Sequence, residues 1–433
     1  MKQNLVFLAL FIAIFALKSP AQATSSAIDL KAARLMYQNI LKTIKDDIKN
    51  KYFDPKMGGV DVEGNSKKAG DLINEAKSVE EMADIIARFL YPFNDSHLFF
   101  SPPSKTTKVE YGWEMRFVGD KIFVIKVEEE SDAYKKGVRV GDQIYMVEGY
   151  IPNRQEFWMF RYHFNILRPQ PVLNVILIKP NGNKYKLALN AKITRDSVFM
   201  PSRRERILEY ETNQQERTEQ SFSDDIPGLA VWKMPNFEIT ELKVDKMMDK
   251  VRKNQALILD LRGNSGGYST TMGQLIGNVF SEKVTLGEIK ERKGARRVAF
   301  EPRGKNIFNG KIVVLIDSDS ASAAELFARI IQLEKRGTVI GDQTMGAVMA
   351  AEVIYHDFGL DTKIPYALTI TVADVIMKDG QRLEKIGVTP DEKILPTAVD
   401  LANKRDPVLA RAAEILGFKV TPEQAGLIFD EKK

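Results

Sequence analysis

Short apolar runs that alternate with helical segments in the second half of the chain constrain its fold most strongly. The apolar runs cover residues 229–232, 256–261, 312–316 and 338–340. Residues 323–333, between the last two runs, have the spacing of an amphipathic helix. Strands that alternate with helices are typical of a sheet whose crossover connections are helical. We therefore predict an α/β core over residues 193–398, within a multidomain α/β protein.

The N-terminal region has a different periodicity. Between residues 28 and 54, apolar residues recur at steps of three and four, which predicts an amphipathic helix. Ser78 followed by Glu81 is the pattern of a capping box at the start of a second helix. These patterns predict a helical region over residues 24–105, with a loop after its last helix.

Three further segments can be assigned from composition and turn signals. Short β-like runs predict a β-rich domain over residues 106–192. The polar stretch 211–225 indicates a surface connection. Asp406-Pro407 at the start of an apolar face and Gly417 at its end predict a helix within a C-terminal helical tail, residues 399–433.

The first 23 residues have the features of a signal peptide. Lys2 is followed by an apolar run from Leu5 to Leu17 and by the small-x-small site Ala21-Gln22-Ala23. We expect an exported protein, periplasmic or secreted, that is cleaved after Ala23; an uncleaved membrane anchor is the alternative. No later segment is long and apolar enough to span a bilayer, so stable membrane insertion is not expected after cleavage.

Composition excludes several kinds of chemistry. The chain has no cysteine and only three histidines, His97, His163 and His356. Thiol catalysis and disulfides are therefore excluded, and a multi-histidine metal site is hard to assemble. The 63 basic and 58 acidic residues are nearly balanced and scattered, so nucleic acid is not an expected partner.

Two turns that follow apolar strands contain candidate functional groups. The glycine-rich turn from Asp260 to Gly267 can present backbone N–H groups to an anion, and it lacks the Lys-Ser/Thr ending of a phosphate-binding loop. Ser322 follows the strand ending at Ile316 and precedes Glu325 by three residues, so it can be an ordinary helix N-cap. A serine at a helix N-terminus is equally well placed for nucleophilic attack.

Several motifs together resemble those of the C-terminal-processing, or tail-specific, peptidases. Residues 260–267, 320–325, 341–346 and 383–391 match that family's motifs in the family's order. Residues 131–144 resemble a PDZ domain, which also precedes the peptidase core in that family. The resemblance implies that Ser322 is the nucleophile and that the backbone N–H groups of Gly267 and Ala323 form the oxyanion hole.

The general base departs from the serine/lysine pattern of that family. Ala347 stands where those peptidases have a lysine, and a serine hydroxyl without a base is a poor nucleophile at neutral pH. Ser96-His97 resembles the pair found in the tricorn-like branch, which uses a Ser-His-Ser-Glu tetrad. This resemblance implies that His97 is the base and that Glu384 supports it through Ser96, with Glu352 as an alternative acid.

The other two histidines are weaker candidates for the general base. His163 lies among aromatic residues and is expected to pack there, while His356 is the second choice of base. A relocated lysine, Lys335 or Lys363, is a further alternative.

The PDZ resemblance places a candidate substrate-binding segment at Gly112, Trp113 and Met115. In PDZ domains the backbone of this segment captures a peptide's carboxylate end. The alternative is a PDZ-shaped domain that only packs against its neighbours.

The sequence therefore predicts an exported serine endopeptidase that acts on polypeptides and requires no metal or organic cofactor. Assembly into a homo-oligomer is a further expectation, because these peptidases often form rings or cages. The competing prediction is a catalytically inactive polypeptide- or hydrophobic-ligand-binding protein on the same scaffold.

Overall fold

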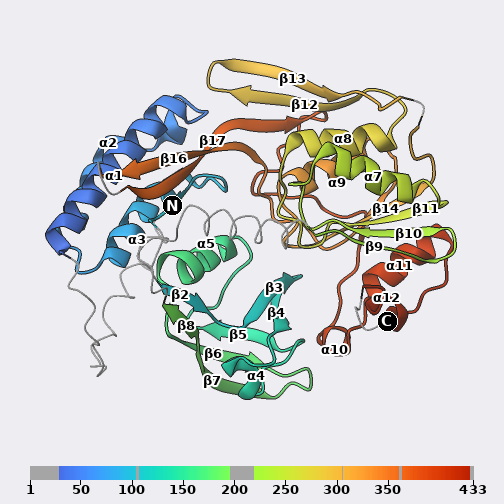
Figure 1. Cartoon of the computed structure of the whole chain (residues 1–433), viewed down its shortest axis with the longest axis horizontal. Coiled ribbons are helices and arrows are strands. Elements are labelled where there is room, and N and C mark those ends of the chain that lie inside the picture. The colour runs from blue at the N-terminus through green and yellow to red at the C-terminus, as the bar shows by residue number, and fades with distance from the viewer. Residues whose placement is uncertain (1–28, 104–106, 196–218, 305, 360–362, 430–433) are drawn as a thin grey trace.

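A computed structural model describes residues 29–103, 107–195, 219–304, 306–359 and 363–429. The protein is a multidomain α/β structure in which N-terminal helices and an α/β core lie at opposite ends, with a five-stranded β module beside them (Figure 1). The predicted signal peptide, residues 1–23, lies outside the described residues. No helix within the described ranges is both long and apolar enough to cross a bilayer.

The core is built on a six-stranded sheet with the order β18-β15-β14-β11-β10-β9. Its strands are β9 (Ser221–Ile226), β10 (Leu229–Lys233), β11 (Ala256–Asp260), β14 (Lys311–Ile316), β15 (Thr338–Gly341) and β18 (Glu392–Lys393). All neighbouring strands are parallel except β9, which pairs antiparallel with β10 at the edge. The predicted sheet with helical crossovers is confirmed.

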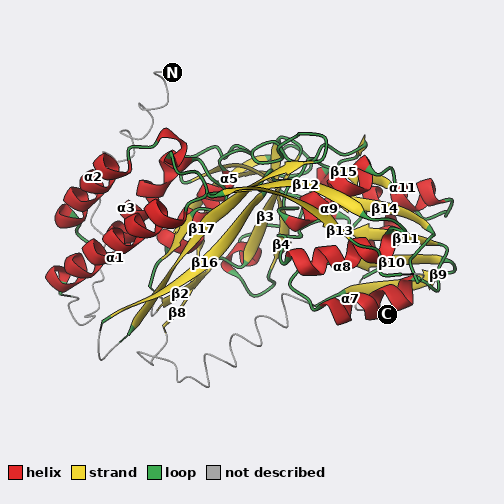
Figure 2. Cartoon of the chain, turned by 90° about the horizontal axis from the view of Figure 1, so that it is seen from above, coloured by secondary structure: helices red, strands yellow, loops and turns green. Residues whose placement is uncertain are grey.

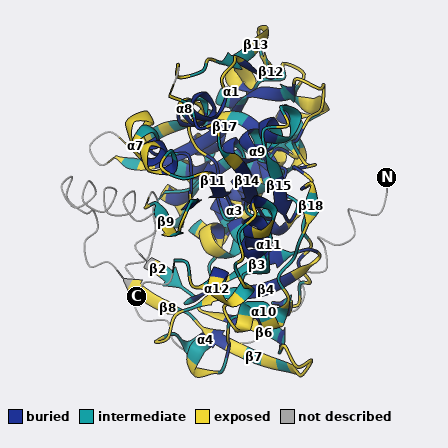
Figure 3. Ribbon diagram, turned by 90° about the vertical axis from the view of Figure 1, so that its right-hand side faces the viewer, coloured by how far each residue is buried: buried dark blue, intermediate teal, exposed yellow. Residues whose placement is uncertain are grey.

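Helices cover both faces of this sheet. One face packs against α7 (Glu241–Val251), α8 (Ser269–Val279) and α9 (Ala323–Leu333), and the other against α11 (Pro407–Leu416) and α12 (Pro422–Gly426). Alternate residues of a strand point to opposite faces of the sheet. Leu257 and Leu259 pack toward α7–α9, whereas Ile258 packs toward α11. Because both faces are covered, the central strands are uninterrupted apolar runs, and Figure 3 shows them as the most buried part of the molecule.

The N-terminal helices pack against a second sheet. The helices are α1 (Leu30–Lys51), α2 (Val62–Glu75) and α3 (Val79–Leu90), and the strands are β1 (Phe99–Ser101), β12 (Val284–Glu291), β13 (Gly294–Phe300), β16 (Met349–Phe358) and β17 (Ile364–Met377). The long antiparallel pair β16–β17 runs from the core to the helices (Figure 2). The apolar faces of α1 and α3 share one core with Phe100, Leu368 and Ile370 of this sheet.

Residues 113–190 form a separate five-stranded antiparallel sheet, which we call the β3–β7 module. It contains β3 (Trp113–Val118), β4 (Lys121–Val127), β5 (Gln143–Val147), β6 (Val172–Ile178) and β7 (Lys184–Asn190), with the helices α4 (Asp132–Lys135) and α5 (Phe157–Tyr162). A separate two-stranded ribbon, β2 (Thr107–Glu110) and β8 (Lys192–Arg195), joins its ends. The strand β3 is an edge strand that pairs only with β4 in this sheet.

Several local predictions are confirmed and others need correction. Helix α11 begins at Pro407 and ends at Leu416, and the following Gly417 adopts the left-handed conformation with φ 94° as its C-cap. Residues 221–225, the end of the stretch 211–225 that was predicted to be a surface connection, lie in strand β9 instead, because the following strand pairs with them. The Ser78 hydroxyl caps α3 as predicted, but the Glu81 carboxylate accepts from the N–H of Lys77 rather than from that of Ser78.

The packing of β1 generates a prediction about stability. Phe100 is fully buried between the N-terminal helices and β17, whereas its neighbour Phe99 is only half-buried. We expect Phe100→Ala to reduce the free energy of unfolding by about 3–5 kcal/mol, because a large cavity opens in this layer. Urea unfolding followed by circular dichroism measures the loss, and Phe99→Ala serves as the control. Equal losses for the two variants would contradict this packing.

Candidate active site

The site is assembled where parallel strands of the core end. The strands β11, β14 and β15 lie side by side, so the turns that follow Asp260, Ile316 and Gly341 meet at one edge of the sheet. Functional groups in open α/β sheets gather at this carboxyl edge. The turns contain the glycine-rich segment, Ser322 and the segment that includes Ala347.

Ser322 is the N-cap residue of α9 and has an unusual backbone conformation. Its φ of 55° and ψ of −118° lie in a region that a non-glycine residue rarely adopts. The N–H of Ser322 donates to the carbonyl of Ala347 at 2.9 Å and to Oε2 of Glu325 at 3.0 Å. Such strained positions cluster at functional sites, where surrounding contacts hold them in place. Ser322 is thus both a helix N-cap residue and a serine held on a strained turn.

The glycine-rich turn packs directly against Ser322. A Cβ atom added to Gly266 would lie 2.6 Å from Cβ of Ser322, and one added to Gly267 would lie 2.5 Å from the carbonyl carbon of Phe237. Gly267 also has a φ of 139°, so neither position can take a side chain without displacing the backbone.

Two backbone donors lie free at this contact. Within the part of the chain that the structure describes, the N–H groups of Gly267 and Ala323 donate to no protein acceptor. Ala323 is the first residue of α9, whose first N–H groups have no partner inside the helix. The two donors predicted for an oxyanion hole are therefore both available.

A second set of groups comes from outside the core. Ser96 and His97 lie in the turn between α3 and β1, and Glu384 lies in the loop after β17. Oγ of Ser96 is 2.8 Å from Nδ1 of His97 and donates to Oε2 of Glu384 at 2.9 Å. The N–H of Ser96 also donates to Oε1 of Glu384 at 3.1 Å. The structure thus brings together three residues that are far apart in the sequence.

The hydrogen bonds of Ser96 fix the tautomer of His97. An ionised carboxylate can only accept, so the single hydroxyl hydrogen of Ser96 points to Glu384. Oγ of Ser96 must then accept from Nδ1–H of His97. In the neutral ring the other nitrogen, Nε2, is left with a free lone pair and can take a proton.

The surroundings of His97 favour that neutral form. Burial lowers the pKa of His97 below its usual value of 6.5, and it outweighs the negative charges of Glu384 and Asp95, which raise the pKa. The nearby ammonium group of Lys385 lowers the pKa further. His97 is therefore an unprotonated base at neutral pH.

Asp95 holds the His97 turn against its neighbours. This buried carboxylate accepts from the N–H of His97 at 2.8 Å, the hydroxyl of Tyr52 at 2.9 Å and the hydroxyl of Thr371 at 2.7 Å. Tyr52 follows α1 and Thr371 lies on β17. The position of His97 is therefore fixed jointly by the helical layer and the second sheet.

The segment 346–348 connects the two halves of the site. The carbonyl of Ala347 accepts from the N–H of Ser322, while the N–H of Val348 donates to Oε2 of Glu384 at 2.8 Å. In the described residues no hydrogen bond joins Ser322 to His97 directly. Contacts between a nucleophile and its base are often longer before substrate binds.

Several sequence-predicted candidates lie elsewhere. His356 pairs with Asp47 at 2.7 Å and stacks on Tyr366, and the ring of His163 packs edge-on against Phe164. Glu352 is exposed on β16.

The two candidate lysines are also remote from Ser322. Lys335 lies beyond the far end of α9, which at 1.5 Å per residue is about 20 Å from Ser322. Lys363 lies at the far end of the β16–β17 pair, near Asp357.

The predicted substrate-binding residues lie at the start of β3. Trp113 is buried in the core of the β3–β7 module and Met115 packs against that core. The carbonyl of Gly112 accepts from the N–H of Glu128. The indole of Trp113 is therefore a packing group, which leaves the backbone of this edge strand as the group able to bind a peptide.

Sequence reasoning missed three charged groups. Glu325 was considered only as part of a capping box, although its carboxylate is fully buried beneath Ser322. Asp95 and Lys385 adjoin His97 and Glu384, and Nζ of Lys385 lies 3.6 Å from Oε1 of Glu384. Asp95 and Lys385 are sequence neighbours of the predicted site residues Ser96 and Glu384, and this was the signal available in the sequence.

Residues 228–394 match the family described as Peptidase family S41. These residues form an S41 domain.

The chain is also similar in sequence to known peptidases. The chain is 31% identical over 170 residues to the tail-specific protease of Haemophilus influenzae, covering 38% of this chain and 24% of that protein. It is 27% identical over 296 residues to the carboxy-terminal-processing protease of Bartonella bacilliformis, covering 66% of this chain and 62% of that protein. Each match spans less than two thirds of the relative's length.

The fold outside the S41 domain is also found in solved structures. The structure of mature CPAF complexed with lactacystin has a TM-score of 0.64 at 14% identity, covering 89% of this chain and 97% of that chain. A crystal structure of mature CPAF has a TM-score of 0.63 at 15% identity, covering 86% and 94%. At this identity the likeness concerns the fold.

The geometry of the relay generates a prediction for nuclear magnetic resonance. We expect His97 to carry its neutral-form proton on Nδ1 and to titrate below pH 6.5. Glu384→Gln should lower the midpoint further, because the carboxylate charge favours the protonated ring. Imidazole nitrogen shifts measure both properties, and His97→Asn assigns the signal. A proton on Nε2, or a midpoint raised by Glu384→Gln, would contradict the arrangement.

Proposed function

We propose that the protein is an exported serine endopeptidase that hydrolyses polypeptides through an acyl-enzyme. The observation that carries the proposal is the pair of half-sites joined by residues 346–348. One half holds Ser322 on a strained turn beside two free N–H groups, and the other holds His97 through a hydrogen bond at Nδ1, from which we infer that Nε2 is unprotonated. The S41 domain and the similarity to processing proteases support the same chemistry.

The proposed reaction uses only groups of this chain. Nε2 of His97 takes the proton of the Ser322 hydroxyl as Oγ attacks the scissile carbonyl carbon. The oxyanion that forms is stabilised by the N–H groups of Gly267 and Ala323. The C–N bond then breaks as the imidazolium returns the proton to the leaving amine, and water releases the acyl group by the same steps in reverse.

Glu384 and Ser96 act on His97 rather than on substrate. When His97 is protonated, its Nδ1–H remains bonded to Oγ of Ser96, whose hydroxyl remains bonded to Glu384. The carboxylate charge stabilises the imidazolium through this bridge, and the two hydrogen bonds hold the ring in one orientation.

Export is part of the same proposal. The predicted signal peptide would be removed after Ala23, leaving a chain that acts in the periplasm or outside the cell. N-terminal sequencing of the exported protein should begin at Thr24, and a protein that still begins at Met1 would contradict cleavage.

The β3–β7 module is proposed to be a PDZ-like domain that gates access to Ser322. Asp319, three residues before Ser322, lies between two arginines of the module. Arg116 of β3 donates to Oδ2 of Asp319 at 2.9 Å, and Arg161 of α5 donates to Oδ1 at 2.9 Å. These ion pairs fix the module directly against the turn that bears the nucleophile.

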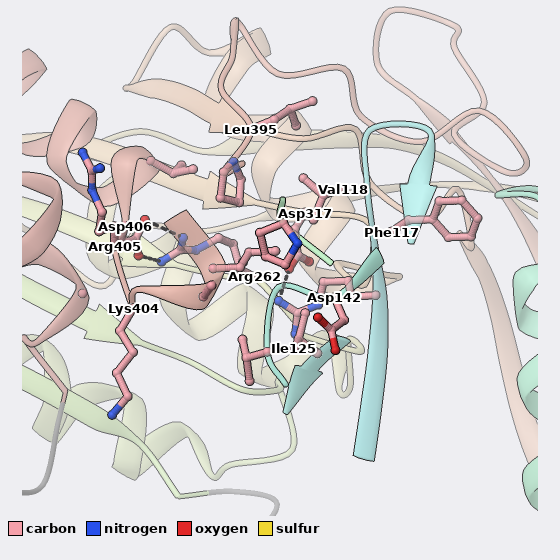
Figure 4. Close-up of a pocket in the computed structure, with 18 of the residues that line it drawn as sticks. Phe117, Val118, Ile125, Asp142, Arg262, Asp317, Leu395, Lys404, Arg405 and Asp406 are labelled. Atoms are coloured by element: carbon pink, nitrogen blue, oxygen red, sulfur yellow. Dashed lines mark hydrogen bonds and ion pairs between the residues drawn. The ribbon is translucent and has the colours of Figure 1, made fainter. Parts of the chain in front are cut away.

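A cleft of about 890 Å³ runs along this contact, lined by residues of the module and of the core. Figure 4 shows Val118 and Ile125 of the module near Asp317 of the core, with Leu395 above them, whereas the ring of Phe117 points away from this group. We propose that a weaker contact here widens the approach to Ser322.

A catalytically inactive binding protein is the competing function. The free N–H groups beside Ser322 and the inferred unprotonated Nε2 of His97 favour the peptidase, because a site that only binds a ligand does not need a general base. Among alternative bases, Lys385 lies beside Glu384, so it replaces Lys335 and Lys363 as the lysine to test.

The main prediction concerns the nucleophile and its base. Ser322→Ala should abolish hydrolysis of an unfolded polypeptide, and His97→Ala should reduce kcat/KM by about 10⁴-fold or more, because the serine loses its base. Labelling of Ser322 by a fluorophosphonate probe should disappear in both variants. Lys385→Ala is the control for a lysine base and should remain labelled.

Two outcomes would contradict the peptidase proposal. Undiminished hydrolysis by Ser322→Ala would exclude the nucleophile, and a folded parent protein that is not labelled would favour the binding protein. Loss of labelling in Lys385→Ala with His97→Ala unaffected would assign the base to the lysine.

The gating proposal has its own test. Arg161 is partly exposed, so its pair with Asp319 contributes about 0.5–1 kcal/mol to the closed arrangement. We expect Arg161→Ala to speed polypeptide hydrolysis about two- to fivefold while leaving the rate of labelling by the small probe unchanged. Arg168→Ala, just after the end of this helical segment and outside this contact, is the control. Unchanged or slower hydrolysis by Arg161→Ala would contradict gating.

A further inference from the structure

The carboxylate of Glu325 is fully buried, and among the described residues it forms no ion pair with a cation. Its two oxygens accept four hydrogen bonds instead. The donors are the N–H of Ser322 at 3.0 Å, the N–H of Gly346 at 2.8 Å, the N–H of Ala347 at 2.9 Å and the hydroxyl of Thr344 at 2.5 Å. The proposed catalytic steps do not use this group, so its presence beneath Ser322 requires another explanation.

The four donors belong to two neighbouring turns, and Glu325 holds these turns in a fixed position relative to each other. Ser322 is on the turn after β14, while Thr344, Gly346 and Ala347 are on the turn after β15. An ordinary helix cap needs one acceptor for one or two N–H groups of its own helix. Glu325 instead joins its own helix to a neighbouring turn through three of its four hydrogen bonds.

That neighbouring turn also reaches the other half of the site. Ala347 accepts from Ser322 through its carbonyl, and Val348 donates to Glu384. The backbone of residues 346–348 is therefore held by Glu325 on one side and by Glu384 on the other. This segment sets the separation between Ser322 and the His97 relay.

We propose that Glu325 is a positioning residue that fixes Ser322 and the segment 346–348 together, and so sets the nucleophile in register with His97. The inference rests on the proposed function, because it concerns the geometry of the same reaction. In this chain Ala347 contributes its backbone to the site, where the resemblance to serine/lysine peptidases led us to expect a side-chain base.

The set of four donors supports a role that a residue without two acceptor oxygens cannot fill. Burial raises the pKa of Glu325 to about 7, and the four hydrogen bonds act in the opposite direction by stabilising the carboxylate. A glutamine would replace one acceptor oxygen with an N–H₂ group that faces backbone donors. The unpaired N–H groups would move apart, and displacements of about 1 Å at such a site can cost about 100-fold in rate.

The test measures chemistry and binding separately. We expect Glu325→Gln to lower kcat for polypeptide hydrolysis and the rate of fluorophosphonate labelling by about 30- to 100-fold, with KM unchanged within about threefold. The dependence of the remaining rate on His97 should persist, so adding His97→Ala should abolish it. Glu334→Gln, at the opposite end of α9, is the matched control and should match the parent.

The outcomes separate this inference from the proposed function. Parent rates in Ser322→Ala or His97→Ala would overturn the peptidase itself. If those variants are inactive but Glu325→Gln has the parent kcat, only the role of Glu325 is overturned. A rise in KM with unchanged kcat would also overturn it, because a positioning residue for the nucleophile acts on the chemical step.

A second pair of variants decides the question if Glu325→Gln does not fold. Thr344→Val removes one donor to Glu325, whereas Thr344→Ser retains the hydroxyl. We expect labelling to be about tenfold slower in Thr344→Val than in Thr344→Ser. Equal rates in these two variants would overturn the inference.

Discussion

The site depends on the parallel register of β11, β14 and β15, which places three turns at one edge of the core sheet. Close packing of Gly266 against Ser322 brings the first two turns together, and the carboxylate of Glu325 joins the second to the third. The strained backbone of Ser322 persists because these contacts hold it from several sides. The positions of the proposed nucleophile and oxyanion donors thus follow from the order of the strands in this sheet.

The proposed base comes from a different layer of the molecule. His97 follows the N-terminal helices, and Asp95 fixes its turn to Tyr52 and Thr371. Glu384 reaches this turn from the loop after β17 and also binds Val348 of the core. The proposed site therefore depends on the packing of the helical layer, the second sheet and the core, which brings residues nearly 300 positions apart to one hydrogen bond.

The sequence allowed prediction of the parts that local patterns determine. Buried strands, the ends of α11 and the turn before His97 follow from apolar periodicity, Pro407 and Gly417, and the stop after α3. The β16–β17 pair and the strand at 221–226 were missed because their pairing is set by distant segments. Ser96, His97 and Glu384 were selected by resemblance, but Glu325 could not be recognised as a link between turns, since spacing alone makes it an ordinary helix cap.

The central claim is that His97 is the general base for Ser322 and that the segment 346–348 holds the two residues in place. A crystal structure of the protein with Ser322 phosphonylated tests this claim most directly. The account predicts Nε2 of His97 within hydrogen-bonding reach, about 2.6–3.2 Å, of the phosphonyl group, with its oxyanion bound by the N–H groups of Gly267 and Ala323. An adduct in which Lys385 occupies that position, or in which His97 stays remote, would contradict it.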